Sequence, residues 1–310
     1  MQLLTVGSVA FDAIETPFGK SDKIVGGAGT YITLAASFFN QNQGLVSVVG
    51  EDFPKEVLRK IASRGIDITG IQIPEGGKTF FWAGRYHNDM NSRDTLVTEL
   101  NVLGAFDPVV PEQFKNAPFL MLGNLSPDVQ RKVVDQMEQR PRLIAMDTMN
   151  FWMDIALEEL HKTLKVVDLL IINDEEARQL TQQYSLKTAA AKIMELGPKS
   201  VIIKKGEHGA LLFHGGLIFS APALPLEEVF DPTGAGDSFA GGLMGYLSSQ
   251  GEVSFDSLKK AVIAGSAVAS FCVEKFGTQR LEEITRNDIA KRMSMLHQLT
   301  HFELTGYGAA

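Results

Sequence analysis

Residues 169–203 read LLIINDEEARQLTQQYSLKTAAAKIMELGPKSVII, and this stretch holds one complete unit of the pattern that decides the fold. The apolar runs Leu169–Ile172 and Val201–Ile203 are typical of short, buried strands. Between them, residues 174–182 and 187–196 repeat apolar side chains at helical spacing. Strands of continuous Val, Ile and Leu that alternate with helices indicate a parallel sheet covered on both faces.

The same alternation continues in both directions along the chain. We expect further strands at residues 3–7, 45–50, 119–122 and 143–146. Further helices are expected at residues 30–39, 54–62, 127–139, 155–165, 235–249, 256–272 and 285–299. The sequence therefore predicts an α/β fold with a mostly parallel central sheet.

Two segments interrupt this alternation. Residues 78–87 and 93–100 are rich in Thr, Phe, Trp and Tyr, and a polar tip at residues 87–92 joins them. This composition predicts a β-hairpin that stands outside the main sheet. Residues 13–25 are irregular and could supply a strand to the same small sheet.

The domain organisation follows from what separates these segments. No long Pro- or Ser-rich linker and no internal repeat divides the sequence. We therefore expect a single domain over residues 1–310, with a small sheet from about 13–25 and 74–101 inserted in it. The end of the chain, residues 304–310, is expected to fray.

The composition excludes several classes of function. The chain has 310 residues, with 29 Lys and Arg against 37 Asp and Glu, for a net charge of −8. An acidic chain lacks the basic surface that nucleic acids and anionic membranes require, so we expect neither as a partner. Six histidines and one cysteine without paired spacing do not indicate a zinc site.

The single cysteine, Cys272, lies in the apolar run Ala267–Val273, which favours a small buried side chain over a nucleophile. A chain with one cysteine forms no internal disulfide and fits a reducing compartment. The sequence shows no signal-peptide pattern and no apolar run of the ~20 residues that a membrane helix needs. We therefore expect a cytoplasmic protein.

The most informative loop covers residues 231–242, which read DPTGAGDSFAGG. Its glycines let the backbone approach a ligand closely, and the small, apolar residues that follow indicate a helix. Free backbone N–H groups at the start of such a helix attract an anion. Because Asp237 lies beside this anion site, it could accept a proton during phosphoryl transfer to an alcohol. The alternative is that Asp237 only caps the helix.

Other nucleotide-binding motifs fail on spacing. Residues 77–79 read GKT, as at the end of a P-loop, but the glycine expected at position 72 is Gln72. No G-x-G-x-x-G run follows a strand, which argues against a Rossmann dehydrogenase. The D-F-G and H-R-D motifs of protein kinases are also absent from the sequence.

The loop from Asp231 to Asp237 resembles the signature of the ribokinase-like sugar kinases, the PfkB family. Segments similar to those of the family occur in order along nearly the whole chain, at residues 7–12, 26–29, 173–176, 204–209 and 275–278. The resemblance implies a three-layer αβα fold in which a small β-sheet forms a lid over the substrate. It also implies ATP-dependent phosphorylation of a hydroxymethyl group on a small sugar or sugar derivative, with ATP and Mg²⁺ as cofactors.

The resemblance assigns roles to particular residues. Asp237 would act as general base, and the backbone N–H groups of four residues, Gly234, Ala235, Gly236 and Asp237, would hold the developing charge. Substrate would meet one set of residues, which comprises Asp12, Gly26, Gly27, Tyr31, Asn124 and, on the lid, Trp82 and Arg85. The nucleotide would meet another set, which comprises Asn173, Glu176, Lys204, Gly206, Gly209 and Gly277. Glu176 would place Mg²⁺ through water, and Asp231 and Thr233 would be candidates for a monovalent cation such as K⁺.

Departures from the family leave alternatives open. Tyr31 stands where the family usually has Asn, and Leu281 stands where some members have a serine near the cation. Aromatic residues such as Tyr31 and Trp82 would also suit a nucleoside kinase of the same superfamily. A ligand-binding protein on a kinase fold is the alternative outside enzymes.

For several other residues, both a functional and a structural interpretation remain open. Trp82 and Arg85 alternate on opposite faces of the expected strand, so either could serve the protein surface or a homodimer through the lid instead of a ligand. Asp147 could contact magnesium or simply cap its loop. Of Lys204 and Lys205, we expect Lys204 to face the nucleotide.

Overall fold

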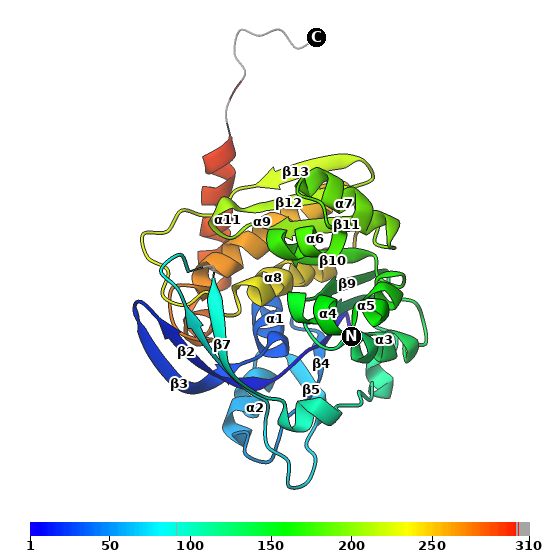
Figure 1. Cartoon of the computed structure of the whole chain (residues 1–310), viewed down its shortest axis with the longest axis vertical. Coiled ribbons are helices and arrows are strands. Elements are labelled where there is room, and N and C mark those ends of the chain that lie inside the picture. The colour runs from blue at the N-terminus through cyan, green and yellow to red at the C-terminus, as the bar shows by residue number, and fades with distance from the viewer. Residues whose placement is uncertain (91, 302, 304–310) are drawn as a thin grey trace.

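The computed structural model describes residues 1–90, 92–301 and 303. The expected frayed end at residues 304–310 lies outside the described residues, as does Asn91 in the expected hairpin tip. Strands, helices and loops follow one another in a single succession from β1 to α11 (Figure 1).

Within the described residues, nine strands form the large sheet, in the order β13-β12-β11-β10-β9-β8-β1-β4-β5. Neighbouring strands run parallel from β11 to β5, and the pairs β11–β12 and β12–β13 run antiparallel. The strands are β1 (Leu3–Val6), β4 (Gln43–Val48), β5 (Ile66–Gln72), β8 (Phe119–Leu122), β9 (Leu143–Asp147), β10 (Leu169–Asn173), β11 (Ser200–Lys204), β12 (Ala210–His214) and β13 (Leu217–Ala221). The predicted mostly parallel sheet is confirmed.

Three strands of this sheet were not expected from the sequence. β5 is only partly buried and contains Gly70, so it lacks the continuous apolar run of the other strands. β12 and β13 form a hairpin whose turn is Gly215-Gly216, and both glycines have positive φ, at 54° and 83°. Two glycines between apolar runs are a recognised hairpin signal, so this element could have been predicted.

Helices cover both faces of the large sheet (Figure 1). One layer packs in the core with Leu4, Leu120 and Ile172, and the other packs with Leu3, Phe119 and Ile171, because alternate strand residues face opposite sides. The first layer contains α3 (Pro127–Asp135), α4 (Asn150–Ile155), α5 (Leu157–Leu164), α6 (Asp174–Thr181) and α7 (Leu186–Glu195). The second contains α1 (Ala28–Ser37), α8 (Ala235–Gln250) and α9 (Phe255–Cys272).

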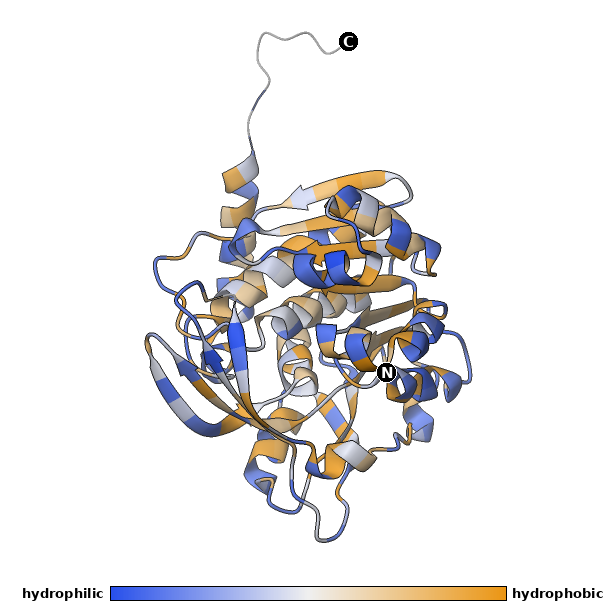
Figure 2. Cartoon of the chain, in the orientation of Figure 1, coloured by the Kyte–Doolittle hydropathy of each residue, from blue (hydrophilic) through white to orange (hydrophobic). Residues whose placement is uncertain are grey.

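The remaining helices are short or peripheral. They are α2 (Lys55–Ala62), α10 (Gln279–Glu283), α11 (Arg286–Thr300) and the 3₁₀ turns η1 (Asn101–Ala105), η2 (Glu112–Phe114) and η3 (Gly206–His208). The helix expected at 155–165 is present as α5, and the short helix α4, which was not expected, precedes it and ends before Ala156. Figure 2 shows hydrophobic colour concentrated on the strands of the large sheet and mixed colour on the helices around it.

The small sheet lies to one side of the large one, on the left in Figure 1. Its order is β3-β2-β6-β7, with strands β2 (Ala10–Thr16), β3 (Gly19–Gly26), β6 (Phe81–Tyr86) and β7 (Arg93–Glu99). The expected hairpin is therefore present as β6–β7, while residues 13–25 contribute to two strands instead of one. The edge strand β7 is exposed along its whole length.

Two further expectations concern single features. Cys272 is buried and free, as its apolar surroundings predict. Among the helices of the described chain, none combines the length and the apolar character needed to cross a membrane.

Candidate active site

The site begins at the carboxyl ends of three neighbouring strands. The register of the sheet pairs Asn173 at the end of β10 with Lys204 at the end of β11, and Asp147 ends the adjacent β9. Lys204 Nζ lies 3.5 Å from Asp147 Oδ1, and both side chains are largely buried. Ligands of open α/β sheets bind outside these strand ends. Lys204 therefore points to this edge, and the Asp147 side chain pairs with it in addition to accepting from the N–H of Thr148.

Asn173 and Glu176 hold each other at the start of α6. The Asn173 side chain accepts from the backbone N–H of Glu176 at 2.7 Å, and the Glu176 carboxylate accepts from the backbone N–H of Asn173 at 2.9 Å. This capping box fixes the position of both side chains beside the strand ends. Burial raises the pKa of Glu176 to about 7, which Lys204 opposes and Asp147 reinforces.

The loop of residues 231–237 leads into α8 and exposes backbone donors. Gly234 precedes the helix with φ at 74°, a conformation that favours glycine. The N–H of Ala235 donates to the Pro232 carbonyl at 3.2 Å, so one of the four expected donors is already engaged. The N–H groups of Gly234, Gly236 and Asp237 have no acceptor in the described part of the chain and remain available to an anion.

Asp237 does not cap α8, so the alternative that this residue serves only as a helix cap is excluded. The N-cap residue is Gly234, and no side chain makes a capping bond there. In the described chain, the carboxylate of Asp237 has neither a hydrogen bond nor an ion pair, although its side chain is only partly accessible. Burial raises the pKa of Asp237 to about 7, Asp147 adds to this, and Lys204 and Arg93 oppose it.

Lys204 supplies a positive charge next to this loop. A Cβ atom at Gly236 would lie 2.9 Å from Lys204 Nζ, so the ammonium group lies directly against the loop. Burial alone would lower the pKa of Lys204, but the carboxylates of Asp147, Glu176 and Asp237 outweigh it and raise the pKa. The lysine is therefore charged where an anion would bind.

Asp12 approaches the same place from the small sheet. A Cβ atom at Gly26 would overlap the Asp12 carboxylate, whereas Gly27 is explained by its φ of 91° and by the Ser8 carbonyl oxygen, 2.5 Å from where its Cβ atom would stand. Burial raises the pKa of Asp12 to about 7, and Asp231 and Asp237 raise it further while the N–H of Gly27 opposes the shift. The structure thus brings Asp12, Gly26 and Gly27 together near the loop.

Asp231 ties two loops together. Its two oxygens accept from the backbone N–H groups of Thr233 and Gly277, each at 2.9 Å. Burial nevertheless raises its pKa. Because both oxygens already accept a backbone hydrogen bond, the side chain has a clear structural role, and its part in holding a monovalent cation stays a prediction, as does that of Thr233.

The small sheet touches the loop through Tyr86. The Thr233 hydroxyl donates to the Tyr86 hydroxyl oxygen at 3.2 Å. Tyr86 was not among the expected site residues, although it ends a strand beside the polar tip. On the same sheet, Arg85 pairs with Glu15 at 2.9 Å at the exposed surface, so the structure does not bring Arg85 into the cluster around Asp237.

Two aromatic residues lie differently from what the sequence suggested. Tyr31 is 1% exposed, and its ring lies beneath the loop, 2.5 Å from where a Cβ atom of Gly234 would stand. Its hydroxyl has no hydrogen-bond partner in the described residues, and burial raises its pKa well above the usual value. Trp82 is half-buried, with Nε1 3.4 Å from Thr95 Oγ1.

The remaining expected residues have local structural roles. Asn124 accepts a hydrogen bond from Trp152 Nε1 at 2.9 Å. Gly206 begins η3 and Gly209 follows it, with φ at 53° and 79°, and the turn from β11 to β12 explains both of them. A Cβ atom at Gly277 would lie 2.8 Å from Ile24 Cδ1.

The cluster fits a nucleotide with Mg²⁺ better than a metal held by protein alone. Within residues 1–90, 92–301 and 303, no group of three or more His, Cys, Asp or Glu side chains could hold a metal ion. The free N–H groups, Lys204 and the single carboxylate of Glu176 suit phosphates whose Mg²⁺ keeps several waters. Glu176 would then reach the ion through water.

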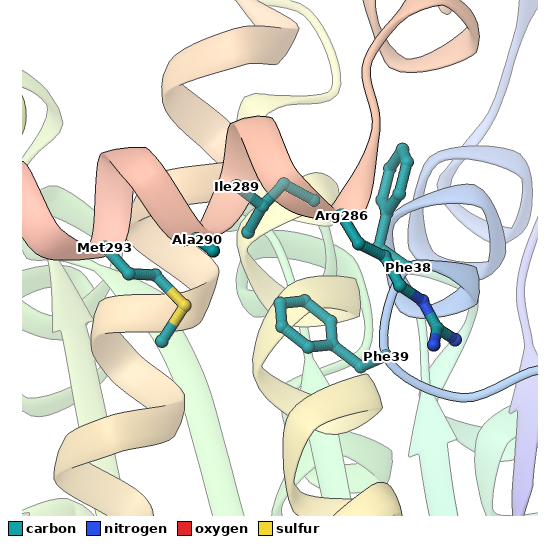
Figure 3. Close-up of a pocket in the computed structure, with 6 residues that line it drawn as sticks. All are labelled: Phe38, Phe39, Arg286, Ile289, Ala290 and Met293. Carbon is teal, nitrogen blue, oxygen red and sulfur yellow. The ribbon is translucent and has the colours of Figure 1, made fainter.

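A separate cavity of about 260 Å³ lies between the end of α1 and the helix α11 (Figure 3). It is lined by Phe38, Phe39, Arg286, Ile289, Ala290 and Met293. None of these residues belongs to the cluster around Asp237, and the lining offers no carboxylate, so the chemistry lies elsewhere.

Comparisons with known proteins identify the family. The model of the pfkB family carbohydrate kinases matches residues 3–285. A cytidine kinase of Thermococcus kodakarensis is 32% identical over 79% of this chain and 88% of its own length. A nucleoside kinase of Methanothermobacter thermautotrophicus is 27% identical over 89% of this chain and 91% of its own length.

Solved structures agree on the fold. A putative ribokinase II from E. coli, in complex with ATP and Mg²⁺, aligns with a TM-score of 0.79 at 21% identity and covers 95% of this chain and 99% of its own. A nucleoside kinase of Methanocaldococcus jannaschii aligns with a TM-score of 0.76 over the same shares. The chain therefore belongs to the pfkB family of carbohydrate kinases, and it is an ATP-dependent sugar or nucleoside kinase with a ribokinase-like fold.

Proposed function

We propose that this pfkB-family kinase transfers the γ-phosphoryl group of ATP to the hydroxymethyl group of a nucleoside. The observation that carries the proposal is the setting of Asp237, whose unbonded carboxylate lies beside the free N–H groups of the α8 N-terminus. A proton acceptor next to an anion site is what phosphoryl transfer to an alcohol requires.

The residues of this site account for the proton transfer and for the charge that develops during the reaction. Asp237 accepts the proton of the acceptor hydroxyl, whose oxygen forms a bond to the γ-phosphorus. The bond from that phosphorus to the oxygen bridging the β- and γ-phosphates breaks, and ADP leaves. The N–H groups of Gly234, Gly236 and Asp237, together with Lys204, stabilise the charge on the transferring group. Ala235 contributes the shape of the turn, since its N–H is engaged by Pro232.

The nucleotide end of the site would be held by the strand-end residues. Mg²⁺, when bound with the nucleotide, would neutralise charge on the phosphates. Glu176 and Asn173, which are fixed by their capping box, would orient the water shell of that ion. Gly206, Gly209 and Gly277 would shape the chain beside the nucleotide, and Asp231 and Thr233 would hold K⁺.

The acceptor would lie under the small sheet. The Asp12 carboxylate would accept hydrogen bonds from ribose hydroxyls. Gly26 leaves room for this carboxylate, and the backbone N–H of Gly27 donates to it. Trp82 would supply an aromatic face for a base, with Asn124 as a polar contact. Because Tyr31 is buried, its ring would support the loop of residues 231–237 from beneath. The sheet would close as a lid, and its exposed edge β7 could join a second subunit.

The preference for a nucleoside rests on the relatives. The cytidine kinase and the nucleoside kinase both align over about nine-tenths of their own length. A small sugar acid is the second candidate, because a 2-dehydro-3-deoxygluconokinase of Thermoproteus tenax is 24% identical over 71% of this chain. The two classes differ in the presence of a base.

The experiment is an ADP-release assay with Mg·ATP and separate pools of nucleosides, sugars and sugar acids. We expect turnover with a nucleoside pool, resolved to a single nucleoside, and loss of that turnover in Asp237→Asn. Turnover confined to a sugar pool would overturn the nucleoside assignment but retain the kinase mechanism. Undiminished turnover by a folded Asp237→Asn variant would overturn the role of Asp237.

A further inference from the structure

Arg93, the first residue of the edge strand β7, lies on the side of the small sheet that contacts the loop of residues 231–237. In the small sheet it is the Cα partner of Tyr86, whose hydroxyl oxygen accepts a hydrogen bond from Thr233 of that loop. Its guanidinium lies 5.9 Å from the centre of the Trp82 ring. The neighbouring pair between Trp82 Nε1 and Thr95 Oγ1, at 3.4 Å, holds this ring against the same strand.

Arg93 also differs from the other basic residues of the small sheet. Arg85 pairs with Glu15, Lys20 pairs with Asp22 and Lys23 pairs with Asp52. Arg93 has no carboxylate partner among residues that the structure describes, and its side chain is exposed. A charge that is fixed by a ring and left unpaired is available to a ligand.

The charge of Arg93 influences groups on both sides of the site. Arg93 opposes the rise in pKa of both Asp237, on the acceptor side, and Glu176, on the nucleotide side. It also opposes the rise in pKa of Tyr86. Together with the pairing of Arg93 to Tyr86, whose hydroxyl contacts Thr233, this puts the charge of Arg93 within reach of both sides of the site.

We propose that the Arg93 guanidinium binds the phosphoryl group during its transfer, so that the small sheet brings a positive charge to the reaction. This inference rests on the proposed function. A guanidinium offers two parallel N–H donors that match phosphate oxygens, and such contacts strengthen as charge spreads over the oxygens in the transition state. The small sheet would then act as a carrier of a catalytic residue as well as a cover.

The test compares Arg93→Gln with Lys20→Gln, which removes the same charge from the same sheet at an exposed ion pair. For Arg93→Gln we expect kcat to fall by about 10²–10³, the loss typical of one donor to developing charge, with the acceptor KM within about threefold. Lys20→Gln should leave both constants close to those of the original protein. Arg93→Lys should recover only part of kcat, because an ammonium cannot bind two oxygens at once.

A rescue experiment separates chemistry from structure. In Arg93→Ala, added guanidinium ion at concentrations well below denaturing ones should restore part of kcat, which a merely structural role would not allow. An unchanged kcat in Arg93→Gln, or a raised acceptor KM with normal kcat, would overturn the proposal. The second result would place the guanidinium on the acceptor instead.

A binding measurement distinguishes failure of this inference from failure of the proposed function. If no acceptor is phosphorylated by the original protein, the proposed function fails, and calorimetry with Mg·ATP and Mg·ADP still tests Arg93. We expect Arg93→Gln to weaken Mg·ATP binding by about tenfold, the loss of one charged hydrogen bond, while Mg·ADP binding is unchanged. Equal effects on both nucleotides, or none, would contradict a contact with the γ-phosphate.

Discussion

Asp231 and Asp237 stand at the two ends of one loop, and burial raises the pKa of both, yet their surroundings differ in kind. Each oxygen of Asp231 accepts a backbone hydrogen bond, one from Thr233 and one from Gly277. Asp237 has no such bond in the described chain and experiences only the fields of Asp147, Lys204 and Arg93. Burial and pKa therefore do not separate the structural carboxylate from the reactive one, whereas the hydrogen bonds do.

The largest expected effect comes from the unbonded end of the loop. Asp237→Asn should lower kcat by about 10²–10⁴, the contribution of a positioned general base. The isosteric amide keeps the shape of the loop, so circular dichroism and Mg·ATP affinity should change little. An equal loss of kcat in Asp231→Asn with undiminished stability would erase the contrast between the two ends.

The pH dependence of the rate is the next test of the comparison. The pKa of Asp237 is raised to about 7, so the carboxylate is protonated below that pH and cannot accept a proton. We expect kcat/KM to fall about tenfold per pH unit below pH 7 and to reach a plateau above it. A flat profile from pH 5 to pH 8, on a background of unchanged folding, would argue against Asp237 as the base.

For stability, the loss should come from substituting Asp231, whereas for activity it should come from substituting Asp237. Asp231→Asn should lower the free energy of unfolding by about 1–3 kcal/mol, because one backbone N–H then faces an amide NH₂. Asp237→Asn should instead raise the stability of the ligand-free protein at pH 8. Urea unfolding of both variants at pH 4 and pH 8 provides the measurement.

The sign of the second effect follows from linkage. The pKa of Asp237 rises from 3.8 to about 7 on folding, so the native state binds more protons than the unfolded state between these values. The stability that the protonated group contributes is complete below about pH 4 and is lost as the pH rises to about 7. The gain from Asp237→Asn should therefore be larger at pH 8 than at pH 4, and an equal gain at both would contradict it.

The smallest effect is expected where the small sheet meets the loop. Tyr86→Phe removes the hydroxyl that accepts from Thr233 and leaves the ring in place. A neutral hydrogen bond of about 0.5–1.5 kcal/mol corresponds to a change of about two- to tenfold in kcat/KM. Steady-state kinetics would show it, with Tyr246→Phe, which lies on α8 away from this contact, as the control.

The sequence could predict those parts of the molecule that depend on local pattern. Apolar runs such as Leu169–Ile172 predict the strands of the parallel sheet, and the glycines of residues 231–237 predict the loop at the start of α8. It could not predict that Arg85 pairs with Glu15, because the two residues lie 70 positions apart in the chain and meet only where β2 pairs with β6. Nor could it predict Arg93, whose position depends on its pairing with Tyr86 across the hairpin.

The residue Tyr31 illustrates a different limit. Its aromatic character suggested contact with a substrate, but long-range packing places the ring under Gly234. Asp12 and Lys204 both lie near the loop of residues 231–237, although β2 of the small sheet carries one and β11 of the large sheet carries the other. Only the assembled pair of sheets contains that information, since the residues are far apart in the chain.

The packing of Tyr31 against Gly234 also constrains the order in which such a loop can change during evolution. A side chain at position 234 meets two obstacles, the positive φ of 74° and the Tyr31 ring 2.5 Å from its Cβ atom. A smaller residue at position 31 would remove only the second obstacle. Mutational paths through position 234 are therefore closed until position 31 has changed, and the two sites should show strong epistasis in a deep mutational scan.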